Sequence, residues 1–269
     1  GHDLYVHDID TDFVSDFVNR GAKDGKSPAD LMRVCEVVIT CLPSPRACDA
    51  VVTAMLGEIK PGKIWLEMST TDAQEVSRLA AIVIAKGGAA VDCPVSGGCH
   101  RADTGNISIF AGCERGTFDR VLPLLTTLGR RVLHTGPVGS ASTLKVATNY
   151  LATTNLLSVC EALVTMKAAG MDLAVTYEAF KISSGNSFVH ETESQVILNG
   201  SRNVTFTMDL VKKDIGLFQK IADDYGVPLE LSPLIVSIFE DGIKRYGPRA
   251  QSDEIIRRLE EPTGLDIRV

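Results

Sequence analysis

A lysine and an asparagine stand four residues apart near the start of a long apolar stretch. Lys145 and Asn149 are surrounded there mostly by Ala, Val, Leu and Thr, and this spacing places them on one face of a helix. Burial removes solvation from an ammonium group and lowers its pKa, which makes a lysine a usable general acid or base. Asn149 could hold a substrate or orient the ammonium without adding charge. The alternative is an ordinary surface lysine with a solvated head.

A serine followed by two glycines forms the second motif. It ends the segment Asp92-Cys93-Pro94-Val95-Ser96-Gly97-Gly98, which follows a predicted buried strand. Glycines let a ligand approach the main chain, so Ser96, Gly97 and Gly98 can offer several backbone N–H groups and one hydroxyl to a carboxylate. A flexible turn without a ligand fits the same residues equally well.

Asp8 is a candidate cofactor residue because it follows a predicted strand at Leu4–His7. In a doubly wound fold a carboxylate there accepts hydrogen bonds from the adenosine ribose and repels a 2′-phosphate. Asp10 adds to the repulsion and no Lys or Arg follows closely, so NAD is favoured over NADP. The alternative is that Asp8 caps the helix beginning at Thr11.

Three further segments carry weaker signals. Cys41-Leu42-Pro43 and Ser69-Thr70 follow predicted strands, at the edge where open α/β sheets bind ligands, although both also fit ordinary turn and cap chemistry. Lys213-Asp214 lies beside Lys212 in an amphipathic stretch, which normally indicates solvated surface charge. None of the three indicates a site by itself.

The first half of the chain alternates predicted strands and helices, which is typical of a mostly parallel sheet with crossover helices on both faces. The predicted strands are Leu4–His7, Val37–Cys41, Lys63–Met68, Ala89–Asp92, Ile107–Ala111 and Arg131–His134. The predicted helices are Thr11–Asn19, Ala47–Leu56, a helix capped by Ser69–Asp72 and ending near Ala85, and Thr117–Leu128. This pattern predicts a Rossmann-like α/β domain.

The second half contains only predicted helices. Ser140–Ala169 has no Pro or Gly, which predicts a helix of about thirty residues ended by Gly170. The later helices are Leu173–Ile182, Phe188–Leu198, Met208–Tyr225, Pro233–Tyr246 and Ser252–Leu259. We therefore expect an α/β domain over residues 1–139 and an all-helical domain over residues 140–269.

The composition excludes several classes of protein. The 269 residues are 45% hydrophobic and 23% charged, which is typical of a globular protein of one large or two unequal domains. The net charge of −7 without a basic stripe argues against nucleic acid or an anionic membrane as partner. The sequence shows no apolar run long enough for a membrane span and no leader pattern. We therefore expect a cytoplasmic protein.

Cysteine usage agrees with that compartment. Most of the seven cysteines lie in apolar runs, where a free thiol behaves as a small hydrophobe. Cys93, Cys99, His100 and Cys113 form the only loose cluster, and they lack the paired spacing of a zinc site. We expect no metal.

The sequence begins as if within a dinucleotide-binding fold. Its first strand, Asp8 and helix correspond to the second strand of such a fold, and no GxGxxG fingerprint occurs. We expect that about 25 residues, one strand plus one helix, precede this start. Without them, the strands on either side of the missing one would expose unpaired ladder groups.

In this order the motifs resemble the β-hydroxyacid dehydrogenase family, which includes 3-hydroxyisobutyrate dehydrogenase and tartronate semialdehyde reductase. The matching features are Asp8, Leu42-Pro43, Ser69-Thr70, Asp92 to Gly98, Gly136 to Gly139 leading to Lys145 and Asn149, and Phe206-x-x-x-Leu210-x-x-Lys213-Asp214. The resemblance implies an NAD(P)-binding Rossmann domain joined to a helical domain that builds a homodimer or homotetramer. It also implies an active site in the cleft between them.

For catalysis, the resemblance implies that Lys145 is the acid/base and Asn149 its partner on the substrate. Ser96, Gly97 and Gly98 would hold the carboxylate of a small 3-hydroxy acid. The implied reaction is reversible hydride transfer between C4 of nicotinamide and the carbinol carbon, with Lys145 taking or delivering the hydroxyl proton.

For the cofactor, the resemblance implies that Leu42, Pro43 and Thr70 line its site and that Lys213 reaches the nicotinamide side, where it would also meet the substrate. Two departures stand out. Thr148 replaces an asparagine found in many relatives, and His100-Arg101 replaces a small, glycine-bearing stretch. Arg101 could recognise a second anionic group on the substrate or cover the outside of the loop.

Two other classes of function remain open. One is a non-catalytic dinucleotide-binding or scaffold protein of the same fold, which would have no use for Lys145, Asn149 and Ser96 together. The other is a hydrolase using Ser96 and Lys145, which would lack the GxSxG elbow and an oxyanion-hole motif. An NAD-dependent 3-hydroxyacid dehydrogenase or semialdehyde reductase fits the motifs best.

Overall fold

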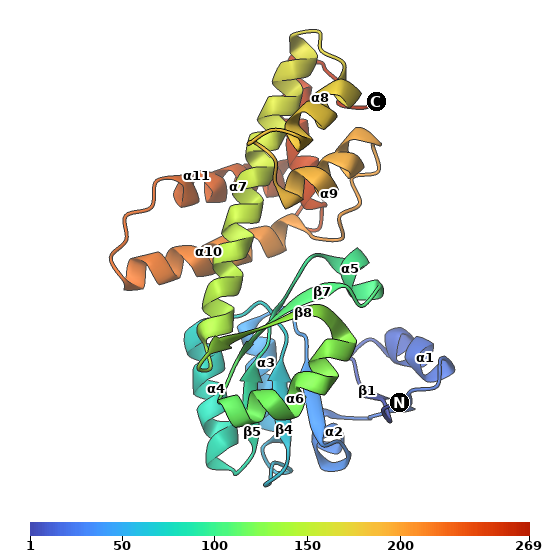
Figure 1. The fold of residues 1–269 in the computed structure, drawn as a ribbon, viewed down its shortest axis with the longest axis vertical. Coiled ribbons are helices and arrows are strands. Elements are labelled where there is room, and N and C mark those ends of the chain that lie inside the picture. The colour runs from blue at the N-terminus through green and yellow to red at the C-terminus, as the bar shows by residue number, and fades with distance from the viewer. The chain divides into compact units, whose positions relative to one another are not determined.

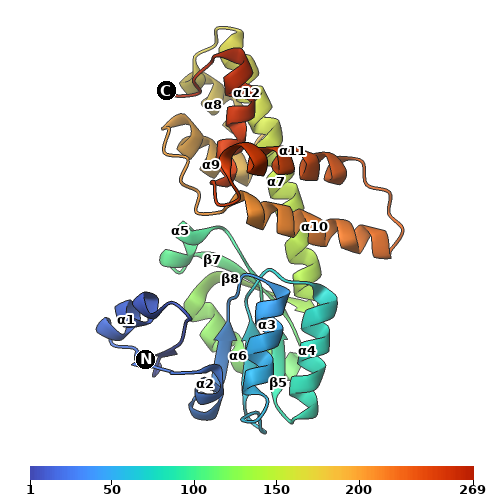
Figure 2. The same cartoon turned by 180° about the vertical axis from the view of Figure 1, so that it is seen from behind.

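The computed structural model describes residues 1–269 as two compact units, the first mixed α/β and the second helical (Figures 1 and 2). The first unit comprises Gly1–Gly97 and Ala102–Lys145, and the second comprises Gly98–Arg101 and Val146–Val269. The division falls inside the long helix that follows Gly139. This architecture confirms the fold class expected from the sequence.

The main sheet of the first unit has the strand order β3-β4-β5-β7-β6, with β8 paired to β7. Its strands are β3 (Val37–Thr40), β4 (Ile64–Glu67), β5 (Ala89–Asp92), β6 (Val95–Ser96), β7 (Ile107–Gly112) and β8 (Gly129–Gly136). β3, β4 and β5 are parallel, but β7 runs antiparallel to β5. The sheet is more mixed than predicted because the chain returns from β5 to β7 without a full crossover helix.

Helices cover both faces of this sheet. Trp65 of β4 packs with α2 (Pro28–Val34), α3 (Pro45–Met55) and α4 (Ala73–Ala85) on one face. Leu66 packs with α6 (Arg115–Leu128) on the other, since successive side chains of a strand alternate between faces. All four residues of β4 are buried, as the continuous apolar pattern predicted.

The start of the chain forms a separate small sheet. β1 (Tyr5–Val6) and β2 (Lys23–Asp24) are parallel and connected by α1 (Thr11–Asn19). They do not hydrogen bond to the main sheet, where β3 is an edge strand and Ile39 is 39% exposed.

Two short helices, α2 and α5 (Cys99–Asp103), were absent from the sequence prediction. The hydroxyl of Ser27 accepts a hydrogen bond from Asp30 N at 3.1 Å, and Pro28 occupies the first turn of α2. A capping serine followed by proline is a helix-start signature, so α2 could have been predicted. α5 is a single turn that follows the double glycine.

The second unit is built around the long helix α7 (Ser140–Ala168), as predicted. The other elements are α8 (Leu173–Lys181), α9 (Phe188–Leu198), α10 (Met208–Asp224), α11 (Leu231–Tyr246), a 3-10 turn (Ser252–Ile256) and α12 (Arg257–Thr263). α10 and α11 pack against each other as a helical hairpin (Figure 2). The core contains Leu163 of α7, Ile197 of α9 and Phe239 of α11, all fully buried.

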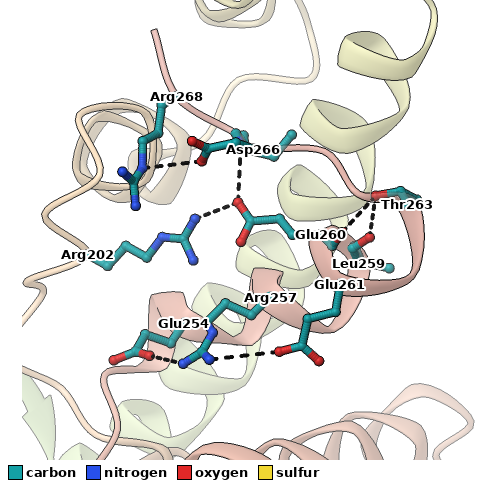
Figure 3. A network of polar contacts seen from close by, with 10 residues as sticks. Arg202, Glu254, Arg257, Leu259, Glu260, Glu261, Thr263, Asp266 and Arg268 are labelled. Carbon is teal, nitrogen blue, oxygen red and sulfur yellow. Dashed lines mark hydrogen bonds and ion pairs between the residues drawn. The ribbon is translucent and has the colours of Figure 1, made fainter.

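A polar network fixes the C-terminal segment of the second unit (Figure 3). The Arg202 guanidinium pairs with Glu260 Oε1 at 2.5 Å, and both side chains are nearly buried. The same oxygen accepts a hydrogen bond from Ile267 N at 3.1 Å. Arg257 bridges Glu254 and Glu261 nearby. α12 and the last residues are therefore attached to the segment before α10.

None of the helices combines the length and apolar composition that a membrane crossing requires. All seven cysteines are free thiols, and no group of three or more His, Cys, Asp or Glu side chains is arranged to hold a metal ion.

Candidate functional site

The segments after β3 and β4 are held together at one edge of the sheet. The two strands are parallel with Thr40 opposite Glu67, so Leu42 and Ser69 emerge side by side. Leu42 N donates to Ser69 Oγ at 2.7 Å. The structure thus brings the segments carrying Leu42, Pro43 and Thr70 together, at the position where open α/β sheets bind ligands.

A buried carboxylate that the sequence analysis did not single out supports this edge. Glu67 is fully buried and accepts hydrogen bonds from Ser69 N and from Thr40 Oγ1, each at 2.8 Å. Thr40 Oγ1 in turn accepts from Trp65 Nε1 at 2.8 Å. The signal in the sequence is a glutamate inside an otherwise apolar strand, because a buried charge requires such partners.

Asp8 follows β1 and is exposed. The cap of α1 is Asp10, whose Oδ1 accepts from Asp12 N at 3.0 Å. Asp8 Oδ1 instead accepts from Asp10 N at 2.9 Å. The helix-cap alternative for Asp8 is therefore wrong, and its carboxylate lies in the turn that follows the strand.

The serine and double glycine form a strand end followed by an unusual turn. Ser96 belongs to β6 and lies opposite Ser108 of β7. Gly97 and Gly98 then adopt φ values of +132° and +82°, where side chains other than glycine are strained. This backbone requires both glycines, and it leaves Gly98 exposed.

Asp92, the first residue of the same motif, is attached to the start of α7. It is fully buried, and its Oδ2 accepts hydrogen bonds from Gly139 N at 3.0 Å and Ser142 N at 2.8 Å. Its Oδ1 accepts from Ser142 Oγ at 2.6 Å. Burial raises the pKa of Asp92, and these hydrogen bonds oppose the rise. Asp92 thus lies outside α7 but caps its N-terminus, and α7 is the helix that carries Lys145.

Lys145 is buried, with 7% of its surface exposed. The solvated surface lysine considered for this position is therefore wrong. Ser142, three residues before Lys145, and Asn149, four residues after it, lie on the same face of α7 as Lys145. The capped end of α7 therefore presents the lysine and the asparagine on one side.

Asn149 is tied to α10. Its Nδ2 donates to Asp214 Oδ2 at 2.5 Å, and Lys213 Nζ lies 2.9 Å from Asp214 Oδ1 as an ion pair. Asp214 is buried and Lys213 is 24% exposed, whereas Lys212 pairs with Glu240 at the surface. Lys213 is thus not the solvated surface charge that the sequence suggested, and Asp214 joins the candidate residues.

The first unit thus combines a sheet edge of the kind that binds ligands in open α/β folds with a buried lysine, Lys145, at the start of α7. Two family models match the chain: that of the NAD binding domain of 6-phosphogluconate dehydrogenase over residues 1–136, and that of NAD-binding of NADP-dependent 3-hydroxyisobutyrate dehydrogenase over residues 139–259. The chain belongs to the β-hydroxyacid dehydrogenase family. The matches support a dinucleotide without distinguishing NAD from NADP.

Individual relatives include enzymes and a nuclear factor. The 2-(hydroxymethyl)glutarate dehydrogenase of Eubacterium barkeri is 28% identical over 99% of this chain and 90% of that protein. Cytokine-like nuclear factor N-PAC of Homo sapiens is 25% identical over 94% of this chain, which spans only 46% of that protein. A structure of 3-hydroxyisobutyrate dehydrogenase from Salmonella typhimurium matches with a TM-score of 0.86 at 22% identity, over 95% and 91% of the two chains.

Proposed function

We propose that this protein transfers hydride between NAD and a small 3-hydroxy acid or the matching semialdehyde. The observation that carries the proposal is the burial of Lys145 on a helix whose start is capped by Asp92. Burying an ammonium group is costly, so a buried lysine in these surroundings is a candidate for proton transfer.

In this proposal Lys145 takes the hydroxyl proton during oxidation and returns it to the carbonyl oxygen during reduction. Asn149, held by Asp214, contacts the substrate hydroxyl without adding charge. The N–H groups of the Ser96–Gly98 turn and the Ser96 hydroxyl bind the substrate carboxylate. This contact orients the substrate so that the hydrogen on its carbinol carbon faces the nicotinamide ring.

The cofactor site fits the residues at the sheet edge. Leu42 and Pro43 offer apolar surface, Thr70 offers a hydroxyl, and exposed Asp8 offers a carboxylate for ribose hydroxyls. Asp8 favours NAD because a 2′-phosphate would meet its negative charge. Lys213 would lie on the nicotinamide side. When bound, the nicotinamide ring accepts or supplies the hydride.

In this proposal the two domains have different roles. Residues 1–139 would bind the dinucleotide, and residues 140–269 would complete the substrate site and form a homodimer or homotetramer. Exposed apolar side chains on the helical unit, Leu151, Val175 and Ile182, support self-association. The seven free thiols suit a reducing compartment such as the cytoplasm.

The test is a panel of 3-hydroxy acids with NAD and NADP, followed by absorbance of the reduced cofactor, and the reverse assay with semialdehydes. We expect turnover of at least one 3-hydroxy acid, faster with NAD. The purified full-length protein in its native oligomeric state should be used. Folded protein that binds NAD but oxidises no member of the panel would contradict the proposal.

A second candidate is a non-catalytic dinucleotide-binding or scaffold protein, favoured by the similarity to nuclear factor N-PAC. It predicts NAD binding without turnover and no functional loss when Lys145 is replaced. The panel therefore separates the two candidates.

A further inference from the structure

A cavity of about 230 Å³ lies within the second unit. One of its walls is a single face of α7, where residues at positions i, i+3, i+4 and i+7 lie together: Asn155, Ser158, Val159 and Ala162. None of the residues proposed to hold substrate or cofactor lines this cavity. It is therefore a separate space inside the helical unit.

The opposite wall comes from α8, α9 and the turn between them. Phe180 of α8 and His190 of α9 contact each other edge to face, with ring centroids 5.6 Å apart. The turn contributes Gly185 and Ser187, the residue that caps α9. His190 is buried, whereas Gly185 is exposed. The cavity therefore has a closed floor and a mouth at the surface.

The lining carries one carboxamide that has no partner inside the protein. His190 Nε2 donates to Tyr177 O at 2.9 Å, since a carbonyl oxygen can only accept, and Nδ1 lies 3.0 Å from Ser194 Oγ. Both ring nitrogens are thus occupied. Asn155 accepts a hydrogen bond only at its main-chain oxygen, from Ser158 Oγ at 3.0 Å. Its side chain can therefore offer two N–H groups and one oxygen to a ligand.

The size of the cavity sets the size of that ligand. A protein cavity of about 150 Å³ binds benzene, which has six non-hydrogen atoms. In proportion, about 230 Å³ would hold roughly nine such atoms. One aromatic ring with a three-atom substituent has this size, and the ring of Phe180 offers it an aromatic contact.

We propose that this cavity binds a small uncharged aromatic amide, a single ring that carries one carboxamide. The ring would pack against Phe180 and Val159, and the carboxamide would exchange two hydrogen bonds with the amide of Asn155. No Asp, Glu, Lys or Arg side chain lines the cavity, so an ionised ligand would lose its hydration without gaining an opposite charge. This site does not depend on the proposed hydride transfer.

Benzamide is the probe, titrated against the full chain and followed by saturation-transfer NMR. NAD is kept in excess, so that benzamide cannot take the place of a nicotinamide ring. We expect a Kd of about 1 mM or tighter. Benzoate has the same shape but a charge, and acetamide has the same amide without the ring. Each should bind at least tenfold more weakly than benzamide.

Two variants locate the binding. Asn155→Leu keeps the size of the side chain and removes its hydrogen bonds, so it should raise the Kd of benzamide at least tenfold. Ala162→Met fills the cavity and should abolish binding. Asn203→Leu and Ala168→Met are the matched controls, because both residues are exposed and neither lines the cavity. Both controls should bind benzamide as the wild type does.

The outcomes separate this site from the activity. Benzoate or acetamide binding as tightly as benzamide would overturn the proposal, as would a wild-type Kd in either cavity variant. Thermal unfolding checks that the variants are folded, and Asn155→Leu decides alone if Ala162→Met is not. Turnover of 3-hydroxy acids is measured independently, so either proposal can fail without the other.

Discussion

Buried carboxylates organise the candidate site residue by residue. Glu67 holds Ser69, Asp92 holds the first turn of α7, and Asp214 holds the Asn149 amide. A buried carboxylate without such partners would cost several kcal/mol, so each of these acids fixes the position of the group that it contacts. They are positioning residues, and none of the three is itself proposed to touch a ligand.

Asp8 controls the choice of cofactor in this account. Asp8→Ala should raise kcat/KM with NADP relative to NAD by about tenfold, because the repulsion of the 2′-phosphate and the ribose hydrogen bonds are both lost. Steady-state kinetics with both cofactors measures the ratio. Asp16→Ala is the control, since Asp16 is also exposed but pairs with Arg20. An unchanged ratio in Asp8→Ala would place the ribose elsewhere.

A second carboxyl pair lies in the helical unit. Burial, followed by the charge of Asp253, raises the pKa of Glu193 to about 9, and burial raises the pKa of Asp253 to about 6. The carboxyl groups of Glu193 and Asp253 hydrogen bond to each other, which requires a proton on one of them. The pair therefore retains a proton near neutral pH.

This proton makes stability depend on pH. An unfolded glutamate ionises near 4.5, whereas folded Glu193 keeps its proton to about 9, so the folded state binds more protons in that window. The free energy of unfolding should fall as pH rises through it, by at most about 1.4 kcal/mol per pH unit. Glu193→Gln should flatten this slope in denaturant unfolding between pH 5 and 9. Exposed Glu191→Gln should retain it, and a wild-type slope of zero would contradict the assignment.

At the scale of elements, sequence patterns predicted what depends on local chemistry. The absence of Pro and Gly from Ser140 onward predicted α7, and apolar runs predicted β3 and β4. The pairing of β6 with β7 was not predictable, because Val95-Ser96 is too short to show a period and its partner is chosen by packing. The antiparallel pairing of β7 with β5 was not predictable for the same reason, because it too depends on long-range packing.

The attachment of β5 to α7 gives a prediction at this scale. Asp92→Asn should lower stability by about 1–3 kcal/mol, because an amide cannot accept all three hydrogen bonds. It should also lower kcat more than it changes KM for NAD, since the end of α7 that carries Lys145 loses its cap. Thermal unfolding and steady-state kinetics measure the two effects.

Ser142→Ala is the matched comparison for Asp92→Asn, since it removes only the hydrogen bond from Ser142 Oγ and should have a milder effect on both quantities. If Asp92→Asn is destabilised but keeps wild-type kcat, the cap stabilises the fold without positioning the lysine.

At the scale of the whole molecule, the order of motifs predicted the α/β and helical organisation and the family. It could not predict the contact between Asn149 and Asp214, because these residues are 65 positions apart in the sequence. Without that contact, the amphipathic pattern around Lys213-Asp214 indicated surface charge. Glu67 was missed for the same reason, because its partners become visible only when β3 and β4 pair.

The fold alone does not determine the activity, since relatives of this chain include a dehydrogenase and a nuclear factor. What distinguishes the two candidates here is the use made of one buried ammonium group. The proposed hydride transfer therefore depends on Lys145 more than on any feature of the architecture.

The most direct test is Lys145→Met, assayed with the best substrate of the panel and compared with Lys167→Met near the far end of α7. If Lys145 transfers the proton, kcat should fall by about 10²- to 10⁴-fold in Lys145→Met, while NAD affinity and the unfolding temperature stay close to those of Lys167→Met. A kcat within tenfold of wild type, about 1.4 kcal/mol in the barrier, would contradict it.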